Sequence, residues 1–172
     1  MPPAERARPR TAEPSRQVRL ATSDDTERCA ALAAEAVQAL QQARGGPLFT
    51  RRESGLLAKA LLRPGGLHRL IDDPRRRVVV AVVGTEIAGL AVGRVDPVGE
   101  AAIGVVDGLY VDPAARGEGV GHALLEDLLA WFTANRCRGV DAGALPGDRL
   151  AKNFWEAAGF KARLLTMHRS LP

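Results

Sequence analysis

Three glycines at alternate positions, Gly117, Gly119 and Gly121, lie between an apolar stretch and a leucine-rich stretch of this chain. Glycine has no side chain and tolerates left-handed backbone angles, so such a turn can point consecutive backbone N–H groups at one anion. A helix that begins at the same point adds the positive end of its dipole to these donors. The loop is therefore predicted to bind a phosphate group, and its members are Arg116, Gly117, Glu118, Gly119, Val120 and Gly121, with His122 directly after them.

Two well-known nucleotide-binding motifs do not fit this loop. The dinucleotide-binding motif needs a parallel strand–helix–strand unit around Gly-x-Gly-x-x-Gly and an acidic residue about 20 residues later, and the spacing here does not match. A P-loop needs Gly-Lys-Ser/Thr after its glycines, whereas His122 and Ala123 follow Gly121. Because glycine-rich turns also serve packing alone, the phosphate prediction depends on the wider sequence.

The composition limits what else the chain could do. With 46% hydrophobic and 26% charged residues, and no apolar stretch of the roughly 20 residues that span a bilayer, the sequence predicts one globular domain without a membrane partner. The formal charge is +4 and aromatic residues make up 4%, which argues against a nucleic-acid-binding face. The two cysteines, Cys29 and Cys137, show no metal-ligand spacing, so we expect no metal site and a reducing, cytoplasmic setting.

The first residues differ from the rest of the chain. Residues 1–17 are rich in proline and arginine and contain no apolar run, so we expect a flexible leader there and the folded domain at 18–172. The arginines of this leader leave open an interaction with an acidic partner.

The elements that must position the glycines follow from hydrophobic periodicity and from helix and strand breakers. Apolar residues three and four apart mark helices, and apolar or alternating runs mark strands. In chain order we expect a strand at 18–20, a helix from 23–25 to 45–47, a helical region at 54–70 interrupted at 64–66, a hairpin of strands at 78–83 and 86–95, a strand at 102–111, a helix from 121 to 135, a strand at 140–144, a helix at 149–158 and a final strand at 160–170. This order predicts a mixed α/β fold in which helices cover a largely antiparallel sheet.

The residues around the glycines resemble those of the GCN5-related N-acetyltransferase (GNAT) family. The acyl-CoA motif of that family is Arg/Gln-x-x-Gly-x-Gly/Ala after a strand that ends in Leu-x-Val-x-Pro, and residues 109–113 and 116–121 match its two parts. Residues 153–160 resemble a second family segment, Asn followed by aromatic-Glu-x-x-Gly-Phe. The resemblance implies an α/β fold with a mixed, mostly antiparallel sheet of six to seven strands, flanked by about four helices.

The resemblance also implies the ligands and their places. Acetyl-CoA, or another acyl-CoA, would be the co-substrate, and an amine of a small molecule or a protein would be the acceptor. The pantetheine arm would lie beside the strand that ends in Leu109, Tyr110 and Val111, as an added strand would. The backbone amides of residues 117–122 would hold the pyrophosphate, and Asn153 and Trp155 would lie beside the CoA arm. A homodimer is compatible with the resemblance.

Members of the family usually transfer the acetyl group directly to the amine, without a covalent enzyme intermediate. An alkylamine with a pKa of roughly 10.4 must first lose a proton, which costs about 4–5 kcal/mol at neutral pH, so a base or a water chain is required. Asp107 is the first candidate base, because strand alternation would place it on the same face as Leu109, and Glu100 is the second. For both residues the alternative is an exposed, solvated carboxylate.

The usual acid of the family, a tyrosine before the glutamate of the second segment, is replaced here by Trp155. An indole N–H can donate a hydrogen bond but has no proton to give. Tyr110 is the only tyrosine of the chain and a weak substitute. The prediction is therefore an acetyl-CoA-dependent N-acetyltransferase in which water or another residue protonates the thiolate; the alternative is a non-catalytic regulatory module that binds acyl-CoA.

Overall fold

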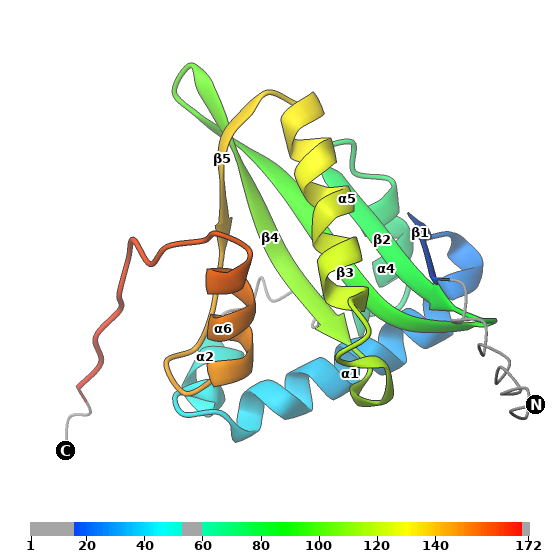
Figure 1. Ribbon diagram of the computed structural model, residues 1–172, viewed down its shortest axis with the longest axis horizontal. Helices are drawn as coiled ribbons and strands as arrows, with labels where there is room; N and C mark the ends of the chain where they lie inside the picture. The colour runs from blue at the N-terminus through cyan, green and yellow to red at the C-terminus, as the bar shows by residue number, and fades with distance from the viewer. Residues whose placement is uncertain (1–15, 53–59, 170–172) are drawn as a thin grey trace, which may run out of the picture.

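The computed structural model describes residues 16–52 and 60–169, which form a five-stranded sheet with helices on both faces (Figure 1). The strands are β1 (Arg16–Leu20), β2 (Arg76–Val83), β3 (Glu86–Val98), β4 (Ala101–Val111) and β5 (Cys137–Ala142). The helices are α1 (Thr26–Gln42), α2 (Gly46–Arg52), α4 (Gly66–Ile71), α5 (Val120–Ala134) and α6 (Arg149–Ala157), with 3-10 turns η1 (Ser23–Asp25) and η2 (Pro113–Ala115). None of the described helices is long and apolar enough to cross a membrane.

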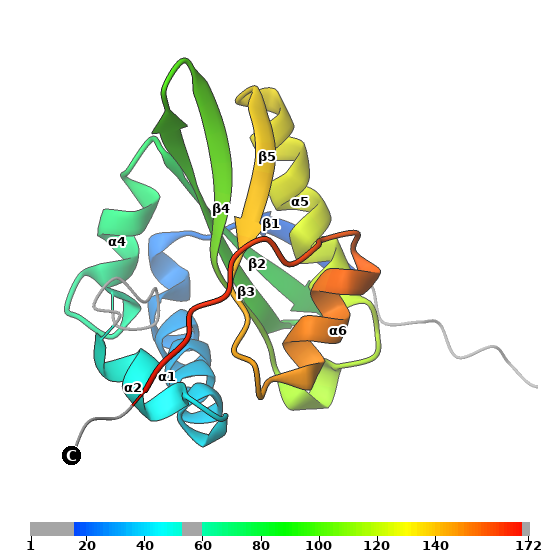
Figure 2. The same cartoon turned by 90° about the vertical axis from the view of Figure 1, so that its left-hand side faces the viewer.

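The strands follow one another across the sheet in the order β1-β2-β3-β4-β5. The first four pair antiparallel, and β5 pairs parallel to β4. A parallel neighbour requires a crossover connection, and α5 supplies it. Figure 2 shows α5 and α6 on one side of the sheet and α1, α2 and α4 on the other.

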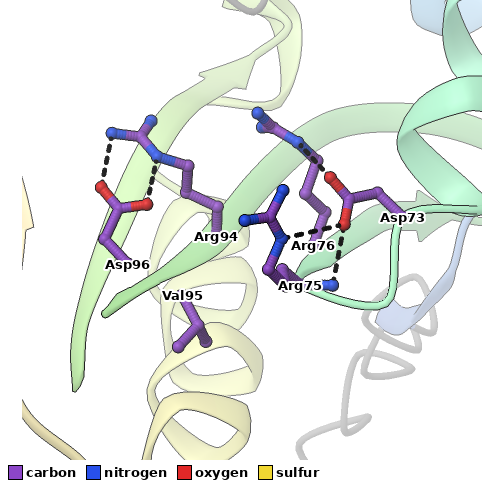
Figure 3. A pocket seen from close by; sticks show the side chains of 6 residues that line it. All are labelled: Asp73, Arg75, Arg76, Arg94, Val95 and Asp96. Carbon is purple, nitrogen blue, oxygen red and sulfur yellow. Dashed lines mark hydrogen bonds and ion pairs between the residues drawn. The ribbon is translucent and has the colours of Figure 1, made fainter. Parts of the chain in front are cut away.

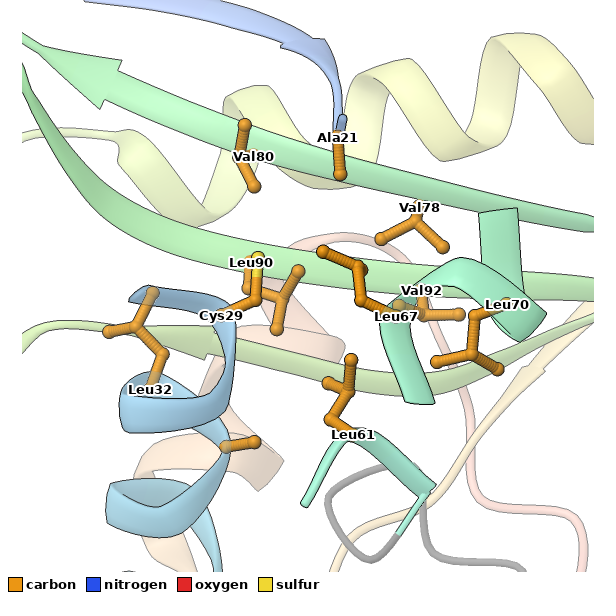
Figure 4. Packing of buried hydrophobic residues seen from close by; sticks show 11 residues of the cluster. Ala21, Cys29, Leu32, Leu61, Leu67, Leu70, Val78, Val80, Leu90 and Val92 are labelled. Atoms are coloured by element: carbon orange, nitrogen blue, oxygen red, sulfur yellow. The ribbon is translucent and has the colours of Figure 1, made fainter. Parts of the chain in front are cut away.

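The apolar run of β2 is buried on both faces because each face is covered by helices. Val78 and Val80 pack in the α1 cluster, which contains Cys29, Leu32, Leu67, Leu90 and Val92 (Figure 4). Val79 and Ala81 point the other way into the α5 cluster, which contains Val120, Leu124, Leu125, Leu128 and Phe132. Full burial of one such aliphatic or aromatic side chain stabilises the fold by about 1.5–3 kcal/mol. The two clusters therefore hold the helices against both faces of the sheet.

Two glycines within strands let α5 approach the sheet closely. An added Cβ would lie 2.7 Å from the ring of Phe132 at Gly93 and 2.6 Å from it at Gly104. Any side chain there would push the helix outward. These strand glycines therefore set the height of α5 above β3 and β4, and with it the position of the loop that precedes the helix.

The predicted mixed α/β architecture is confirmed, but the sheet has five strands in the described residues rather than six to seven. The final strand expected at 160–170 is wrong for residues 160–169, which have no regular secondary structure and pair with none of the five strands. Leu164, Leu165 and Met167 there are 70–82% exposed. Apolar and β-favouring residues make a strand only where a neighbour pairs with them.

Two further differences lie near the N-terminus. β1 begins at Arg16, two residues before its expected start and inside the segment assigned to the leader. Residues 45–47 were expected to end a helix, yet α1 ends at Gln42 and α2 begins at Gly46, with Pro47 in its first turn, where proline is tolerated. The region expected to be helical at 54–70 falls partly outside the described residues, and α4 occupies its end.

Lowering the pH below 4 is expected to remove a stabilising ion pair between β1 and η1. Hydrogen bonds from the Arg19 guanidinium, at 2.7 and 2.8 Å, lower the pKa of the buried Asp25 carboxyl from 3.8 to about 2, with a further contribution from the Thr22 amide. Because the folded pKa lies below the unfolded one, this stability is complete above pH 4 and is lost as the pH falls toward 2. Arg19 is 37% exposed, so solvent screening limits the contribution to about 1–2 kcal/mol.

Urea denaturation of the wild type and Asp25→Asn at pH 6 and pH 2.5 tests this. The variant should be less stable at pH 6, and the difference should shrink at pH 2.5, whereas Asp24→Asn, at an exposed neighbour, should match the wild type. An equal difference at both pH values would contradict the ion-pair account.

Candidate functional site

The glycine loop (residues 116–121) joins the end of β4 to the start of α5. At the end of β4 the Asp112 carboxylate accepts a hydrogen bond from the Ala114 amide at 2.9 Å and caps the short turn η2. Gly117 and Gly119 then adopt left-handed backbone angles, with φ of 85° and 77°. Gly119 is the N-cap of α5. Glycine adopts these angles without strain, so the chain can turn sharply at both positions.

The loop leaves a row of backbone donors without partners. From Gly117 to His122, no backbone N–H donates to an acceptor within the described chain; the first that does is Ala123, which donates to the Gly119 carbonyl at 3.1 Å. Unpaired N–H groups at the start of a helix, together with its dipole, favour an anion. The loop predicted to bind phosphate thus has the arrangement of donors that this chemistry needs.

Phe154 of α6 packs against the end of the glycine loop, where α5 begins. A Cβ at Gly121 would lie 3.2 Å from its ring, and the His122 ring packs edge-on against it at 5.1 Å between centroids. Asp148 caps α6 by accepting from the Ala151 amide at 2.9 Å, as its sequence predicts. The absence of a side chain at Gly121 therefore lets α6 pack closely on the loop.

Arg116 fastens the loop to the strand before it. Its Nε donates to the Val111 carbonyl at 3.1 Å, and its guanidinium lies 5.5 Å from the centroid of the Tyr110 ring. A cation over a tyrosine face contributes about 0.5–1 kcal/mol at an exposed site. Arg116 thus acts on the loop's position through β4.

β4 and β5 pair only over part of their length and then diverge (Figure 1). The last paired residues are Val106 and Ala142, so residues 107–111 of β4 have no partner on the β5 side. Open N–H and C=O groups of a strand can bind an extended ligand as an added strand. This open edge leads directly into the glycine loop.

The expectation that Asp107 and Leu109 share a face is wrong. The pairing of β3 with β4 shifts register between Gly108 and Val106, and a bulge of this kind reverses the alternation of side chains. Leu109 packs in the α5 cluster. Asp107 points to the other face, where its carboxylate accepts from Arg76 at 2.5 Å and also from Arg94.

The Asp107 side chain is therefore held in a network of ion pairs on the face of β4 opposite to Leu109. Both of its carboxylate oxygens accept from guanidinium groups, and its side chain is 7% exposed. The two arginines also line a cavity of about 230 Å³, whose walls are Asp73, Arg75, Arg76, Arg94, Val95 and Asp96 (Figure 3). Glu100 lies in the exposed turn before β4, at the end of the strand away from the glycine loop.

Tyr110 lies beside α1. Its hydroxyl donates to the Glu35 carboxylate at 3.4 Å. Burial, with the nearby charge of Glu35, raises the pKa of Tyr110, so the phenol keeps its proton at neutral pH. Glu35 lies 3.5 Å from Arg28, which bonds to Asp112 at 2.6 Å. This network ties α1 to the strand before the loop, and no local sequence pattern marks Glu35 or Arg28 as part of it.

Trp155 packs between two aromatic rings in the α5 cluster. Its ring lies 4.9 Å from that of Phe154 and 5.1 Å from that of Phe160, and its buried indole Nε1 has no hydrogen-bond partner among the described residues. Asn153, its neighbour on α6, is exposed.

The two thiols differ from a reactive cysteine. Burial raises the pKa of Cys29 to about 11 and also raises that of Cys137. A nucleophilic cysteine needs the opposite shift, because the thiolate is the reacting form. Neither thiol is activated for covalent catalysis.

Comparison with known proteins agrees with this geometry. The model of the acetyltransferase (GNAT) family matches residues 48–160, more than half of the chain. No curated protein matches the chain in sequence.

Solved structures share the fold at low sequence identity. The tetramutant of the BH1408 protein from Bacillus halodurans is 21% identical with a TM-score of 0.77, covering 90% of this chain and 99% of its own. The aminoglycoside N-acetyltransferase AAC(6')-Iy in complex with CoA is 18% identical with a TM-score of 0.68, covering 95% and 99%. The aminoglycoside acetyltransferase meta-AAC0020, from an uncultured soil metagenomic sample and in complex with sisomicin, is 16% identical with a TM-score of 0.66, covering 91% and 97%.

Proposed function

The chain belongs to the acetyltransferase (GNAT) family, and from this premise we propose that it transfers an acyl group from acetyl-CoA, or another acyl-CoA, directly to an amine. One observation carries the proposal. The backbone N–H groups of residues 117–122 are consecutive, are unpaired within the described chain and stand at the start of α5. Such donors suit the two phosphate groups of the CoA diphosphate.

In the proposed complex the CoA diphosphate lies on the glycine loop and the pantetheine arm follows the open edge of β4. On the side away from β3, residues 107–111 of β4, which include Leu109, Tyr110 and Val111, have no β5 partner and offer an edge for the arm. Asn153 and Trp155 lie in α6, whose Phe154 already packs on the loop, so we place them beside the arm. The thioester then lies near the point where β4 and β5 diverge.

The proposed reaction is a direct acyl transfer. The amine nitrogen attacks the thioester carbon, the C–S bond breaks, and the CoA sulfur leaves as a thiolate. The amine loses one proton and the sulfur gains one. Because neither Cys29 nor Cys137 is activated, no acyl-cysteine intermediate is proposed. Because both oxygens of Asp107 accept from arginines, we assign deprotonation of the amine to water.

For the acceptor we propose a small basic molecule with a primary amine. The fold is shared with aminoglycoside N-acetyltransferases, one of them in complex with the aminoglycoside sisomicin. Aminoglycosides therefore belong in the first panel of acceptors, together with polyamines, amino acids and lysine peptides.

A spectrophotometric assay of thiol release from acetyl-CoA across this panel tests the proposal. Amine-dependent release, with the acylated amine seen by mass spectrometry, is the expected result. The second candidate function, a regulatory module that binds acyl-CoA, is favoured by Trp155 at the position of the family's usual tyrosine. Calorimetric binding of acetyl-CoA without turnover of any amine would support the module, and no binding at all would contradict both functions.

Tyr110→Phe is expected to lower kcat by about 10–30-fold, because protonating the departing thiolate is worth only about 2 kcal/mol at neutral pH. The phenol stays protonated and lies on the open part of β4, so we propose it as the proton donor. CoA binding should change little. The assay should be run with the best acceptor of the panel, with Arg138→Gln, an exposed change on β5 outside the proposed site, as control. An unchanged kcat for Tyr110→Phe would assign the proton to water.

A further inference from the structure

A basic side chain from the opposite edge of the sheet reaches the glycine loop. Arg16 is the first residue of β1, and its guanidinium donates to the backbone carbonyl of Glu118. A Cβ at Gly119 would lie 2.8 Å from its Nη1 and 3.7 Å from its Nη2. The guanidinium therefore lies directly against the part of the loop where the unpaired amides stand.

The register of the sheet explains how this side chain arrives there. Val18, Ala81, Gly89 and Val111 form one row across the four antiparallel strands. β4 ends at Val111 of this row, and the chain continues toward the glycine loop. At the same end of the sheet, β1 begins at Arg16, two residues before Val18. Val18 packs in the α5 cluster, and residues two apart in a strand share a face, so Arg16 lies on the face of the sheet that α5 covers.

The charge at this place lacks a counterion in the described chain. Six other arginines, Arg19, Arg28, Arg76, Arg77, Arg94 and Arg163, contact carboxylates within 4 Å at closest distances of 2.8 Å or less. No carboxylate of the described residues pairs with Arg16 in this way. The start of α5 carries the positive end of the helix dipole, which repels a cation. An anion bound between the two would reverse this repulsion.

We propose that Arg16 is a phosphate-binding residue of the acyl-CoA site, an inference that rests on the proposed function. A guanidinium presents five N–H donors in a planar fork that matches the oxygens of a phosphate group. One donor of Arg16 holds the Glu118 carbonyl. The remaining donors supply a positive charge beside the backbone amides, next to Gly119, whereas Phe154 of α6 packs on Gly121.

Isothermal titration calorimetry with CoA tests the proposal on the full chain. Arg16→Gln should raise the Kd by about 10-fold or more, the usual effect of losing a hydrogen bond to a charged group. Arg16→Lys should lose less affinity for CoA, because lysine keeps the positive charge but lacks the planar set of donors of the guanidinium. Arg138→Gln is the matched control, since Arg138 is exposed on β5, and it should bind CoA within about twofold of the wild type, as expected for an exposed charge outside the site. Raising the salt concentration should weaken binding more for the wild type than for Arg16→Gln.

Dephospho-CoA identifies the phosphate that is contacted. An equal loss for Arg16→Gln with CoA and dephospho-CoA assigns Arg16 to the diphosphate, and a loss with CoA alone assigns it to the 3'-phosphate; both support the proposal. Thermal denaturation of each variant confirms folding. If the wild type binds CoA and Arg16→Gln binds as tightly as Arg138→Gln, or more tightly than the wild type, the role of Arg16 is refuted while the proposed function stands. If the wild type gives no heat, the proposed function fails as well.

Discussion

Replacing Gly119 with glutamate is expected to raise the Kd for CoA at least about 100-fold. A residue with a side chain at φ of 77° strains the backbone by roughly 1–2 kcal/mol. The new Cβ would also lie 2.8 Å from Arg16 Nη1 and displace that guanidinium. The added carboxylate would repel the diphosphate or occupy the amides itself. Calorimetry with CoA at low salt measures the change.

Gly99 provides the matched control for this substitution. It has φ of 60° in the turn between β3 and β4, and no atom lies within 4 Å of a Cβ built there. Gly99→Glu therefore carries similar backbone strain and the same added charge away from the glycine loop. We expect it to lose stability and to keep CoA affinity within about twofold, as for an exposed charge. Equal affinity for CoA in the wild type and both variants would show that the glycine loop does not bind the diphosphate.

The glycine loop could be predicted from the sequence because its information is local. Alternate glycines, an apolar strand before them and a helix with a leucine stripe after them lie within about 30 residues, and β4 and α5 appear where these patterns place them. The hairpin of β2 and β3 is local in the same sense. Successive side chains of these strands point alternately into the α1 cluster and the α5 cluster, which explains why both strands are apolar at consecutive positions.

Contacts between distant segments could not be predicted in this way. Arg16 and Glu118 are 102 positions apart, and Tyr110 and Glu35 are 75 apart. Neither pair has a spacing that a single sequence reveals. Arg16 also belongs to a segment that composition alone assigns to a leader, and only the pairing of β1 with β2 shows that it lies within the sheet.

The register of a strand could not be predicted from the sequence either. Alternation predicts the face of Asp107 only if β4 has no bulge, and one extra residue reverses every later position. The aromatic segment of α6 shows a related limit. Its pattern marks Trp155, whereas Phe154 is the residue that contacts Gly121 and His122, since the orientation of a short helix depends on its packing.

Asp107→Asn is expected to lower the free energy of unfolding by about 2–4 kcal/mol. Removal of one partner from a buried ion pair is strongly destabilising, because the other charge is left without compensation. Here two guanidinium groups, of Arg76 and Arg94, meet at one carboxylate that is 7% exposed. Their own exposures of 26% and 33% place the estimate below that for a fully buried pair. Urea denaturation at pH 7 measures the loss.

Asp141→Asn is the control for this ion pair, because Asp141 also pairs with an arginine but at the surface, where Arg163 is 72% exposed. An exposed pair contributes little to stability because solvent screens it, so Asp141→Asn should destabilise the fold clearly less than Asp107→Asn. At a temperature where Asp107→Asn is folded, kcat and the Kd for CoA should stay within a few-fold of the wild type. If Asp107 were instead the general base, kcat would fall by about 10²–10⁴-fold with stability nearly unchanged. That outcome would require the carboxylate to leave both arginines during turnover, and would overturn the structural role assigned to it by the bulge in β4.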